Sequence, residues 1–107
     1  MTSLPRDELV KAREDQASIV AWADETFGPA SSIARVAARA NEEMAELLRH
    51  ATSGQSAEKC LEEAADVVIV LMRVASLTGG NLFDAIDAKM AVNRARKWNL
   101  DKTGHGY

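Results

Sequence analysis

The chain has 107 residues, the size of one domain, and its content of 47% hydrophobic and 27% charged residues supports a modest core. Thirteen Lys and Arg against sixteen Asp and Glu give a formal net charge of −3. This sign argues against a surface that neutralises many phosphates of a duplex, so polymeric nucleic acid is not an expected partner.

The sequence also lacks the marks of export and of membrane insertion. A single cysteine, Cys60, cannot form a disulfide within the chain, and no basic-then-apolar leader opens it, so we expect a cytoplasmic protein. The most apolar run, 64–75, is interrupted by Asp66 and Arg73 and is shorter than the ~18 residues that a membrane helix needs. No membrane association is therefore expected.

The residue pattern predicts an all-α domain of four helices. Ala, Leu, Glu, Lys and Arg dominate, and no sustained alternation of β-branched and aromatic residues is present. Helix-opening and helix-ending residues predict the segments 5–27, 32–50, 56–79 and 81–98, with caps at Ser31 or Ser32, at Ser56 and at Asn81. One domain should span 1–107, with 1–4 and 99–107 as flexible or tail segments.

The short loops predict antiparallel neighbours in a four-helix bundle. The third segment is apolar around more of its circumference than the other short helices of one chain can cover. We therefore expect a homodimer or homotetramer in which a second subunit covers the remainder.

Two acidic pairs are the most informative feature. Glu43 and Glu46 are three residues apart on the second predicted helix, and residues at that spacing share a helix face. Glu63 and Asp66 have the same spacing on the third. If the two helices pack antiparallel, the four carboxylates converge, and like charges inside a bundle are costly unless a cation lies between them. The pattern predicts a metal site.

Asp66 carries the most weight in this interpretation. An acidic pair on one helix is more often only a solvated face, but a carboxylate inside the apolar run 64–72 is expected to be buried and to need a partner or an ion. Ligands that are all oxygen suit Mg²⁺, with Mn²⁺ as a substitute. His50 and Cys60 lack the spacing of a zinc or di-iron ligand set, and we interpret His50 as a helix-end residue.

A basic stripe is predicted on the fourth helix. Lys89, Asn93 and Arg96 lie at i, i+4 and i+7 and share a face. Basic residues also gather near helix C-termini because they interact favourably with the helix dipole, which explains Arg96 better than Lys89. Asn93 is an unfavourable residue in the middle of a helix and could hydrogen bond a sugar or base. The stripe is a candidate substrate contact.

Taken in order, these motifs resemble the MazG-like branch of the all-α NTP pyrophosphatase superfamily. They are Glu42-Glu43-x-x-Glu46, Glu63-x-x-Asp66 and Lys89-Met90-x-x-Asn93-x-x-Arg96. The resemblance implies an Mg²⁺-dependent enzyme that hydrolyses a (deoxy)nucleoside triphosphate to the monophosphate and pyrophosphate. It also implies a role for each motif residue: Glu43, Glu46, Glu63 and Asp66 as metal ligands, Glu42 as a supporting acid, and Lys89 and Asn93 as contacts to phosphate and nucleoside.

Two further segments suggest a branch within that family. The region of Trp22 and Thr26-Phe27-Gly28, together with 87–98, is similar to bacterial and phage dATP/dGTP diphosphohydrolases. Val70 stands where dCTP-cleaving relatives carry a Tyr. The resemblance thus suggests purine deoxynucleotides as candidate substrates, and the identity of the base stays open.

The expected mechanism follows from these parts. Metal held by the carboxylates would bridge phosphate oxygens and acidify a water molecule. Lys89 and Arg96 would neutralise the remaining phosphate charge, and Glu46 or Glu42 would accept the proton of the water. Two other interpretations stay open: a non-catalytic helical module for oligomerisation or binding, and a metal-dependent phosphohydrolase acting on a different pyrophosphate substrate.

Overall fold

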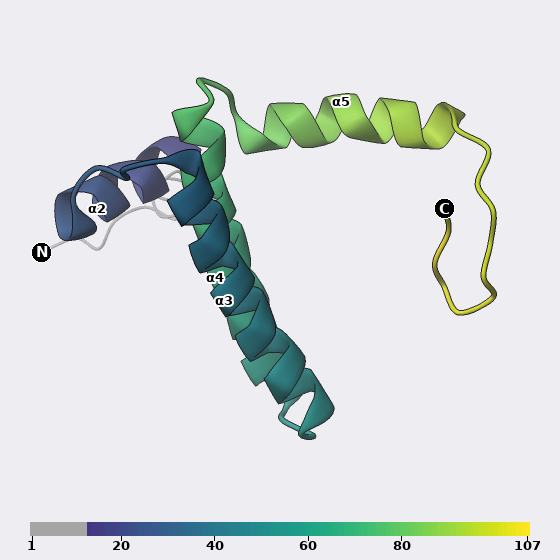
Figure 1. Cartoon of the computed structure of the whole chain (residues 1–107). Coiled ribbons are helices and arrows are strands. Elements are labelled where there is room, and N and C mark those ends of the chain that lie inside the picture. The colour runs from purple at the N-terminus through teal and green to yellow at the C-terminus, as the bar shows by residue number, and fades with distance from the viewer. Residues whose placement is uncertain (1–12) are drawn as a thin grey trace, which may run out of the picture.

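A computed structural model describes residues 13–107 and contains four helices in that range. They are α2 (Gln16–Phe27), α3 (Ile33–Thr52), α4 (Ala57–Leu77) and α5 (Leu82–Ala95), shown in Figure 1. The only extended pairing in this part of the chain is an isolated bridge between Leu100 and Gly106. The prediction of an all-α fold is confirmed for the described residues.

Side-chain caps set the starts of three helices where the sequence predicts them. The hydroxyl of Ser32 accepts a hydrogen bond from the backbone N–H of Arg35, and that of Ser56 accepts from Lys59. The side chain of Asn81 accepts from two backbone N–H groups at the start of α5. Each cap satisfies donors that the first turn of a helix leaves without partners.

The bounds of the first and last helices differ from the prediction. A single helix over 5–27 is wrong, because Asp15 caps α2: its carboxylate accepts from Ser18 N–H, and the Ser18 hydroxyl accepts from Asp15 N–H. The predicted start at Pro5 lies outside the described residues. At the other end α5 stops at Ala95 rather than near Trp98, since Arg96 has extended backbone (φ −81°, ψ 141°).

Helices α3 and α4 form a long antiparallel hairpin, with α2 packed across the end near the start of α3 (Figure 1). Helix α5 leaves the same end and projects away from the hairpin, contacting little beyond the end of α4. The described chain is therefore not the closed four-helix bundle that the short loops predicted. Within the described part of the chain, the buried apolar residues are few and mostly small: Ala23, Val36, Ala40 and Met72.

Two side chains tie α2 to the rest of the fold. Gln16 is buried; its Nε2 donates to the carbonyl of Gly80 at 2.8 Å, and its Oε1 accepts from Leu82 N–H at 2.7 Å. Arg73 of α4 donates from Nη2 to the Asp24 carboxylate at 3.0 Å and to the Gly28 carbonyl at 2.9 Å. These bonds fix α2 against both ends of the α4–α5 turn and against the last turns of α4.

The segment after α5 folds back on itself. Asn99 and Tyr107 exchange two backbone hydrogen bonds, and the Trp98 indole donates to the carbonyl of Asn93 at 2.9 Å. The guanidinium of Arg96 lies 4.2 Å from the centre of the Trp98 ring. No helix within residues 13–107 is both long and apolar enough to cross a membrane.

Candidate metal site and adjoining pocket

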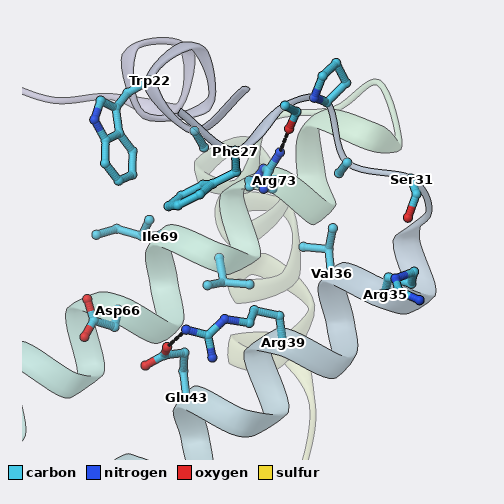
Figure 2. A pocket seen from close by; sticks show the side chains of 15 residues that line it. Trp22, Phe27, Ser31, Arg35, Val36, Arg39, Glu43, Asp66, Ile69 and Arg73 are labelled. Atoms are coloured by element: carbon cyan, nitrogen blue, oxygen red, sulfur yellow. Dashed lines mark hydrogen bonds and ion pairs between the residues drawn. The ribbon is translucent and has the colours of Figure 1, made fainter. Parts of the chain in front are cut away.

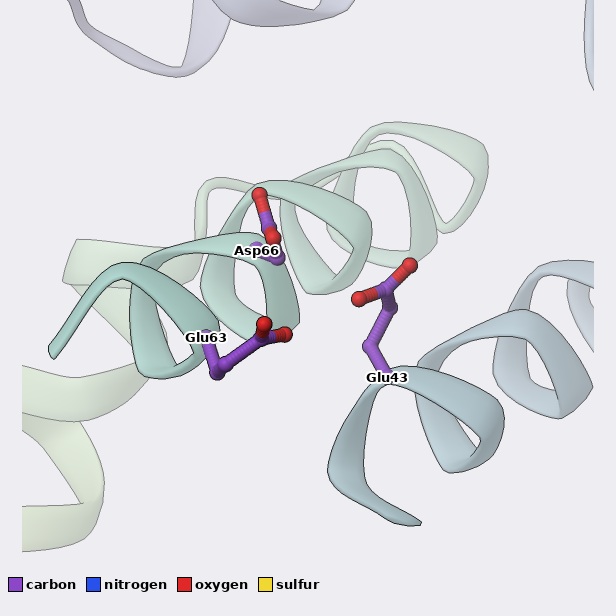
Figure 3. Close-up of side chains that lie close together, drawn as sticks. All are labelled: Glu43, Glu63 and Asp66. Atoms are coloured by element: carbon purple, nitrogen blue, oxygen red, sulfur yellow. The ribbon is translucent and has the colours of Figure 1, made fainter. Parts of the chain in front are cut away.

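Three carboxylates meet between α3 and α4. Glu43 comes from α3, while Glu63 and Asp66 come from α4, and each offers an oxygen within 4.8 Å of the others (Figure 3). The spacing of Glu63 and Asp66 places both on the face of α4 that meets α3. The sequence prediction that acids from these two helices converge is confirmed for these three residues, hereafter the acidic cluster.

Basic side chains offset two members of the acidic cluster. Arg39, one turn before Glu43, brings Nη2 to 2.5 Å from Glu43 Oε1. Glu63 Oε1 lies 3.6 Å from Lys59 Nζ and 3.4 Å from His50 Nε2. Asp66 has no basic partner among residues 13–107. The cluster thus keeps one carboxylate whose negative charge is not paired by a neighbouring side chain.

Glu46 lies outside the acidic cluster. Its carboxylate pairs with Arg49 and sits 3.7 Å from His50 Nε2, so His50 lies between Glu46 and Glu63. Glu42 is exposed and pairs with Arg39 at 3.1 Å. The roles predicted for Glu46 as a ligand and for Glu42 and Glu46 in proton transfer stay predictions. The interpretation of His50 as only a helix-end residue missed its contact with Glu63.

The expected burial of Asp66 is wrong within the single chain. Asp66 is exposed, whereas Glu63 is buried with only 10% of its side chain accessible. The apolar run around Asp66 suggested a helix covered on all sides, but α4 is open on more than one face: Asp66 is exposed beside α3, and Val68, on the opposite face of α4, is 41% exposed. Asp66 therefore reaches solvent while still facing Glu43 and Glu63.

The donor set of the acidic cluster fits a hard divalent cation. All three groups offer only carboxylate oxygens, which suit Mg²⁺ and Mn²⁺ better than softer metals. Three ligands on two helices leave further coordination positions for water or substrate oxygens, as Mg²⁺ sites that carry phosphates commonly do. The residues present are thus able to hold such an ion together with a phosphate-bearing ligand.

A cavity of about 470 Å³ adjoins the acidic cluster and lies between α2 and the α3–α4 hairpin (Figure 2). Glu43 and Asp66 belong to its wall, as do the aromatic rings of Trp22 and Phe27 on α2. These rings meet edge to face at 5.4 Å and are 55% and 69% exposed. The cavity therefore places an aromatic surface beside carboxylates that can hold a metal.

In the sequence, Trp22 and Phe27 stand out only through the resemblance to dATP/dGTP diphosphohydrolases. Their role in the cavity depends on how α2 ends. Gly28 has φ of 83°, a left-handed value that favours glycine, and Pro29 follows it, so the chain turns sharply after Phe27. The signal that the sequence offers is a pair of aromatic residues in the helix that ends at this Gly-Pro turn. The packing of α2 is needed to show that both residues line the cavity.

The predicted substrate residues lie apart from the acidic cluster and from this cavity. Lys89 and Asn93 are on α5, but Arg96 follows its last residue with extended backbone, so the prediction that all three share one helix face is wrong for Arg96. Lys89 and Arg96 are exposed, and none of Lys89, Asn93 and Arg96 belongs to the wall of the cavity. Helix α5 carries them away from the hairpin (Figure 1). Asn93 is half-buried, and its Oδ1 has no hydrogen-bond partner in the described chain. Their contact with substrate stays a prediction.

No known protein-family model matches the chain. No solved structure matches it. A curated relative, the dATP/dGTP diphosphohydrolase of Cyanophage S-2L, is 38% identical over 85 residues, which cover 79% of this chain and 75% of the relative. Identity of this level over most of both chains indicates common descent. The chain belongs to the same family as this dATP/dGTP diphosphohydrolase.

Proposed function

We propose that the chain is a metal-dependent nucleoside triphosphate pyrophosphohydrolase of the MazG-like type. The observation that carries the proposal is the convergence of Glu43, Glu63 and Asp66 within 4.8 Å, beside a cavity with an aromatic wall. Metal-bound phosphates and a stacked base are the two parts of a nucleotide that such neighbouring surfaces fit. The activity named for the cyanophage relative supports the same assignment.

The reaction joins water to the substrate and breaks one phosphoanhydride bond. The oxygen of water attacks the α-phosphorus, the bond from that phosphorus to the bridging oxygen breaks, and nucleoside monophosphate and pyrophosphate leave. When bound, Mg²⁺ or Mn²⁺ supplies charge neutralisation and a more acidic water. Glu43, Glu63 and Asp66 hold and orient the ion, and Glu46 or Glu42 of the neighbouring α3 turns accepts the proton of the water.

The base of the substrate occupies the adjoining cavity. About 470 Å³ lies within the usual range of small-molecule sites, and Trp22 and Phe27 offer ring faces or edges for stacking. Because Glu43 and Asp66 belong to the same wall, a base there leaves the triphosphate directed toward the acidic cluster. The name of the cyanophage relative leads us to propose purine deoxynucleotides, dATP and dGTP, as substrates.

Product analysis with a panel of nucleotides tests this function. The purified chain is incubated with each of the four deoxynucleoside triphosphates in Mg²⁺, in Mn²⁺ and in EDTA, and products are separated by ion exchange. We expect monophosphate and pyrophosphate from dATP and dGTP, only with metal. In ¹⁸O-labelled water the label should enter the monophosphate, because water attacks the α-phosphorus. Release of orthophosphate, or turnover in EDTA, would contradict the proposal.

We also propose that the working form is a homo-oligomer, a dimer or tetramer. Large apolar side chains of α5 are exposed in the single chain, among them Phe83 at 54% and Ile86 at 44%. A projecting helix with such a surface gains stability when a second copy covers it. Contacts of Lys89 and Asn93 with substrate then come from the α5 of another copy, because each chain's own α5 leads away from its acidic cluster.

Sedimentation equilibrium checks this assembly. We expect a dimer or tetramer at micromolar concentration, and Ile86→Asp should shift it toward monomer because a charge cannot be buried at an apolar contact without a partner. A monodisperse monomer of the unaltered chain at that concentration would show that the exposed surface of α5 stays open.

A further inference from the structure

Among residues 13–107, Arg39 is the cationic side chain that both pairs with a member of the acidic cluster and belongs to the cavity wall (Figure 2). Its Nη2 lies 2.5 Å from Glu43 Oε1, and its Nη1 lies 3.1 Å from Glu42 Oε2. More than half of the side chain, 56%, is accessible. The guanidinium is therefore attached to a carboxylate that can hold a metal, yet it is free enough to turn toward the cavity.

The other cations near the site are placed differently. Arg73 is engaged by the Asp24 carboxylate and the Gly28 carbonyl. Lys59 pairs with Glu62 and Glu63 and does not belong to the cavity wall. Arg35 belongs to the wall, but no carboxylate within the described chain pairs with it. Arg39 thus differs from its neighbours in contacting the acidic cluster at the cavity.

A divalent cation and Arg39 compete for the same carboxylate. Glu43 Oε1 forms a close ion pair with the guanidinium, and an ion bound to that oxygen weakens or displaces this pair. The displaced guanidinium keeps its charge and its planar set of donors. A phosphate group carried by the same ion presents oxygens that match this donor set in pairs.

We propose that Arg39 is a substrate-binding residue that exchanges Glu43 for a phosphate of the nucleotide when metal and nucleotide bind. This inference rests on the proposed function, since it takes the ligand at the acidic cluster to be a metal-bound phosphate chain. It assigns the phosphate-binding charge to α3, next to the cluster, in addition to the α5 residues that the sequence singled out. Metal without nucleotide has to displace Arg39, whereas metal with nucleotide gives it a new partner.

Two binding measurements with Arg39→Ala test the exchange, and they should change in opposite directions. Binding of Mn²⁺ alone, followed by the electron paramagnetic resonance of the free ion, should become about 5-fold tighter because the competing cation is gone. Binding of α,β-methylene dATP in saturating Mg²⁺, followed by calorimetry, should become about 10-fold weaker or more because a phosphate contact is lost. Arg39→Lys should weaken analogue binding less than Arg39→Ala, since it keeps the charge but not the paired donors.

Arg35→Ala is the matched control for charge. It removes the same charge from the same helix one turn away, where no carboxylate of the described chain is its partner, so Mn²⁺ affinity should stay within about twofold. Circular dichroism and thermal unfolding verify that each variant keeps the fold. A general loss of structure would weaken both ligands together and is distinguished from the exchange by the opposite signs.

The inference would be overturned if Arg39→Ala bound Mn²⁺ no tighter than the unaltered chain does. It would also be overturned if the variant bound α,β-methylene dATP as well as the unaltered chain does. Neither measurement requires turnover. If the unaltered chain hydrolyses no nucleoside triphosphate, the proposed function fails while the two affinities still decide the role of Arg39. If the unaltered chain does hydrolyse nucleoside triphosphates but the affinities for Mn²⁺ and for the analogue do not change in opposite directions, the proposed role of Arg39 is wrong and the proposed function stands.

Discussion

Asp66→Asn separates the metal role of the acidic cluster from its role in the fold. The substitution keeps the shape of the side chain and removes one negative charge. Because Asp66 is exposed and has no basic partner among the described residues, its neutralisation leaves no cation without a partner. The same change at Glu43 or Glu63 would remove one acidic partner of Arg39, or of Lys59 and His50, and would confound the result.

The expected magnitude follows from the geometry of the cluster. Two unit charges 4.8 Å apart repel by about 1 kcal/mol in a water-like dielectric and by about 3 kcal/mol at an effective value of 20. The exposure of Asp66 and the cations beside its neighbours favour the lower figure. In EDTA, Asp66→Asn should therefore raise stability by about 1 kcal/mol, or a melting temperature by about 4 °C for a domain of this size.

With metal present the effect should reverse. Loss of one of three carboxylate ligands should weaken Mg²⁺ binding and lower kcat/KM by at least ~100-fold, which corresponds to about 2.7 kcal/mol. Thermal unfolding in EDTA and in Mg²⁺, with steady-state kinetics on dATP, measures both effects. Glu62→Gln is the control, because Glu62 is an exposed acid on the same helix outside the cluster. Unchanged turnover in Asp66→Asn, or equal loss in Glu62→Gln, would refute the reasoning.

Other changes probe the scaffold, the base cavity and the C-terminal segment. Gln16→Ala removes both bonds of a buried amide, to the Gly80 carbonyl and the Leu82 N–H, and should cost about 2–3 kcal/mol in urea unfolding. Trp22→Ala should raise KM about 10-fold with little change in kcat, because stacking contributes about 1–3 kcal/mol equally in the ground and transition states. The hydrogen bond from the Thr103 hydroxyl, followed by those from backbone N–H groups, lowers the pKa of Asp101. A carboxylate with a lowered folded-state pKa stabilises the loop above its ordinary pKa and loses that effect as pH falls through the lowered value, so the amide resonances of Asp101 and Thr103 should show a transition at acidic pH, below the ordinary range of an aspartate.

Helix starts could be predicted because they depend on local chemistry. Ser32, Ser56 and Asn81 each cap a helix with a side-chain acceptor, and such caps need only the next few residues. The start of α2 was missed although its signal is equally local: Asp15 and Ser18 form a capping box with Ser in place of the usual Glu or Gln. Pro5 is a stronger helix-start signal than this variant of the capping box, so the sequence pattern favours a start at Pro5.

The arrangement of the helices could not be predicted from the same signals. Short loops favour antiparallel neighbours, and α3 and α4 obey this rule. The turn between α4 and α5 is equally short, yet α5 leaves the hairpin, and the Gln16 side chain bonds the carbonyl of Gly80 and the N–H of Leu82 in that turn. The partners of these two hydrogen bonds are separated by 64 and by 66 positions in the sequence. Contacts over such separations cannot be predicted from the pattern of neighbouring residues.

The acidic cluster was predictable in outline and the cavity was not. Spacing of three residues placed Glu63 and Asp66 on one face, and the antiparallel hairpin brought Glu43 to them. Glu46 has the same spacing from Glu43, but Arg49 and His50 hold it outside the cluster, and their competition is not visible in the spacing of acids. The cavity depends on how α2 crosses the hairpin, which long-range bonds decide.

The basic side chains beside the acidic cluster form ion pairs with it and still keep part of their surface in solvent. Arg39 and Lys59 are 56% and 44% accessible, whereas the side chains of their partners Glu43 and Glu63 are only 13% and 10% accessible. The two basic side chains offset part of the repulsion among acids that lie within 4.8 Å of one another. Because their outer parts are in solvent, they can move aside when a divalent ion binds. Asp66, which has no such partner in the described chain, offers an oxygen that an ion can bind before any pair is broken. On the proposed function, a divalent ion that arrives with its nucleotide would bind first at Asp66 and then displace the pairs, and it would release Arg39 at the wall of the cavity.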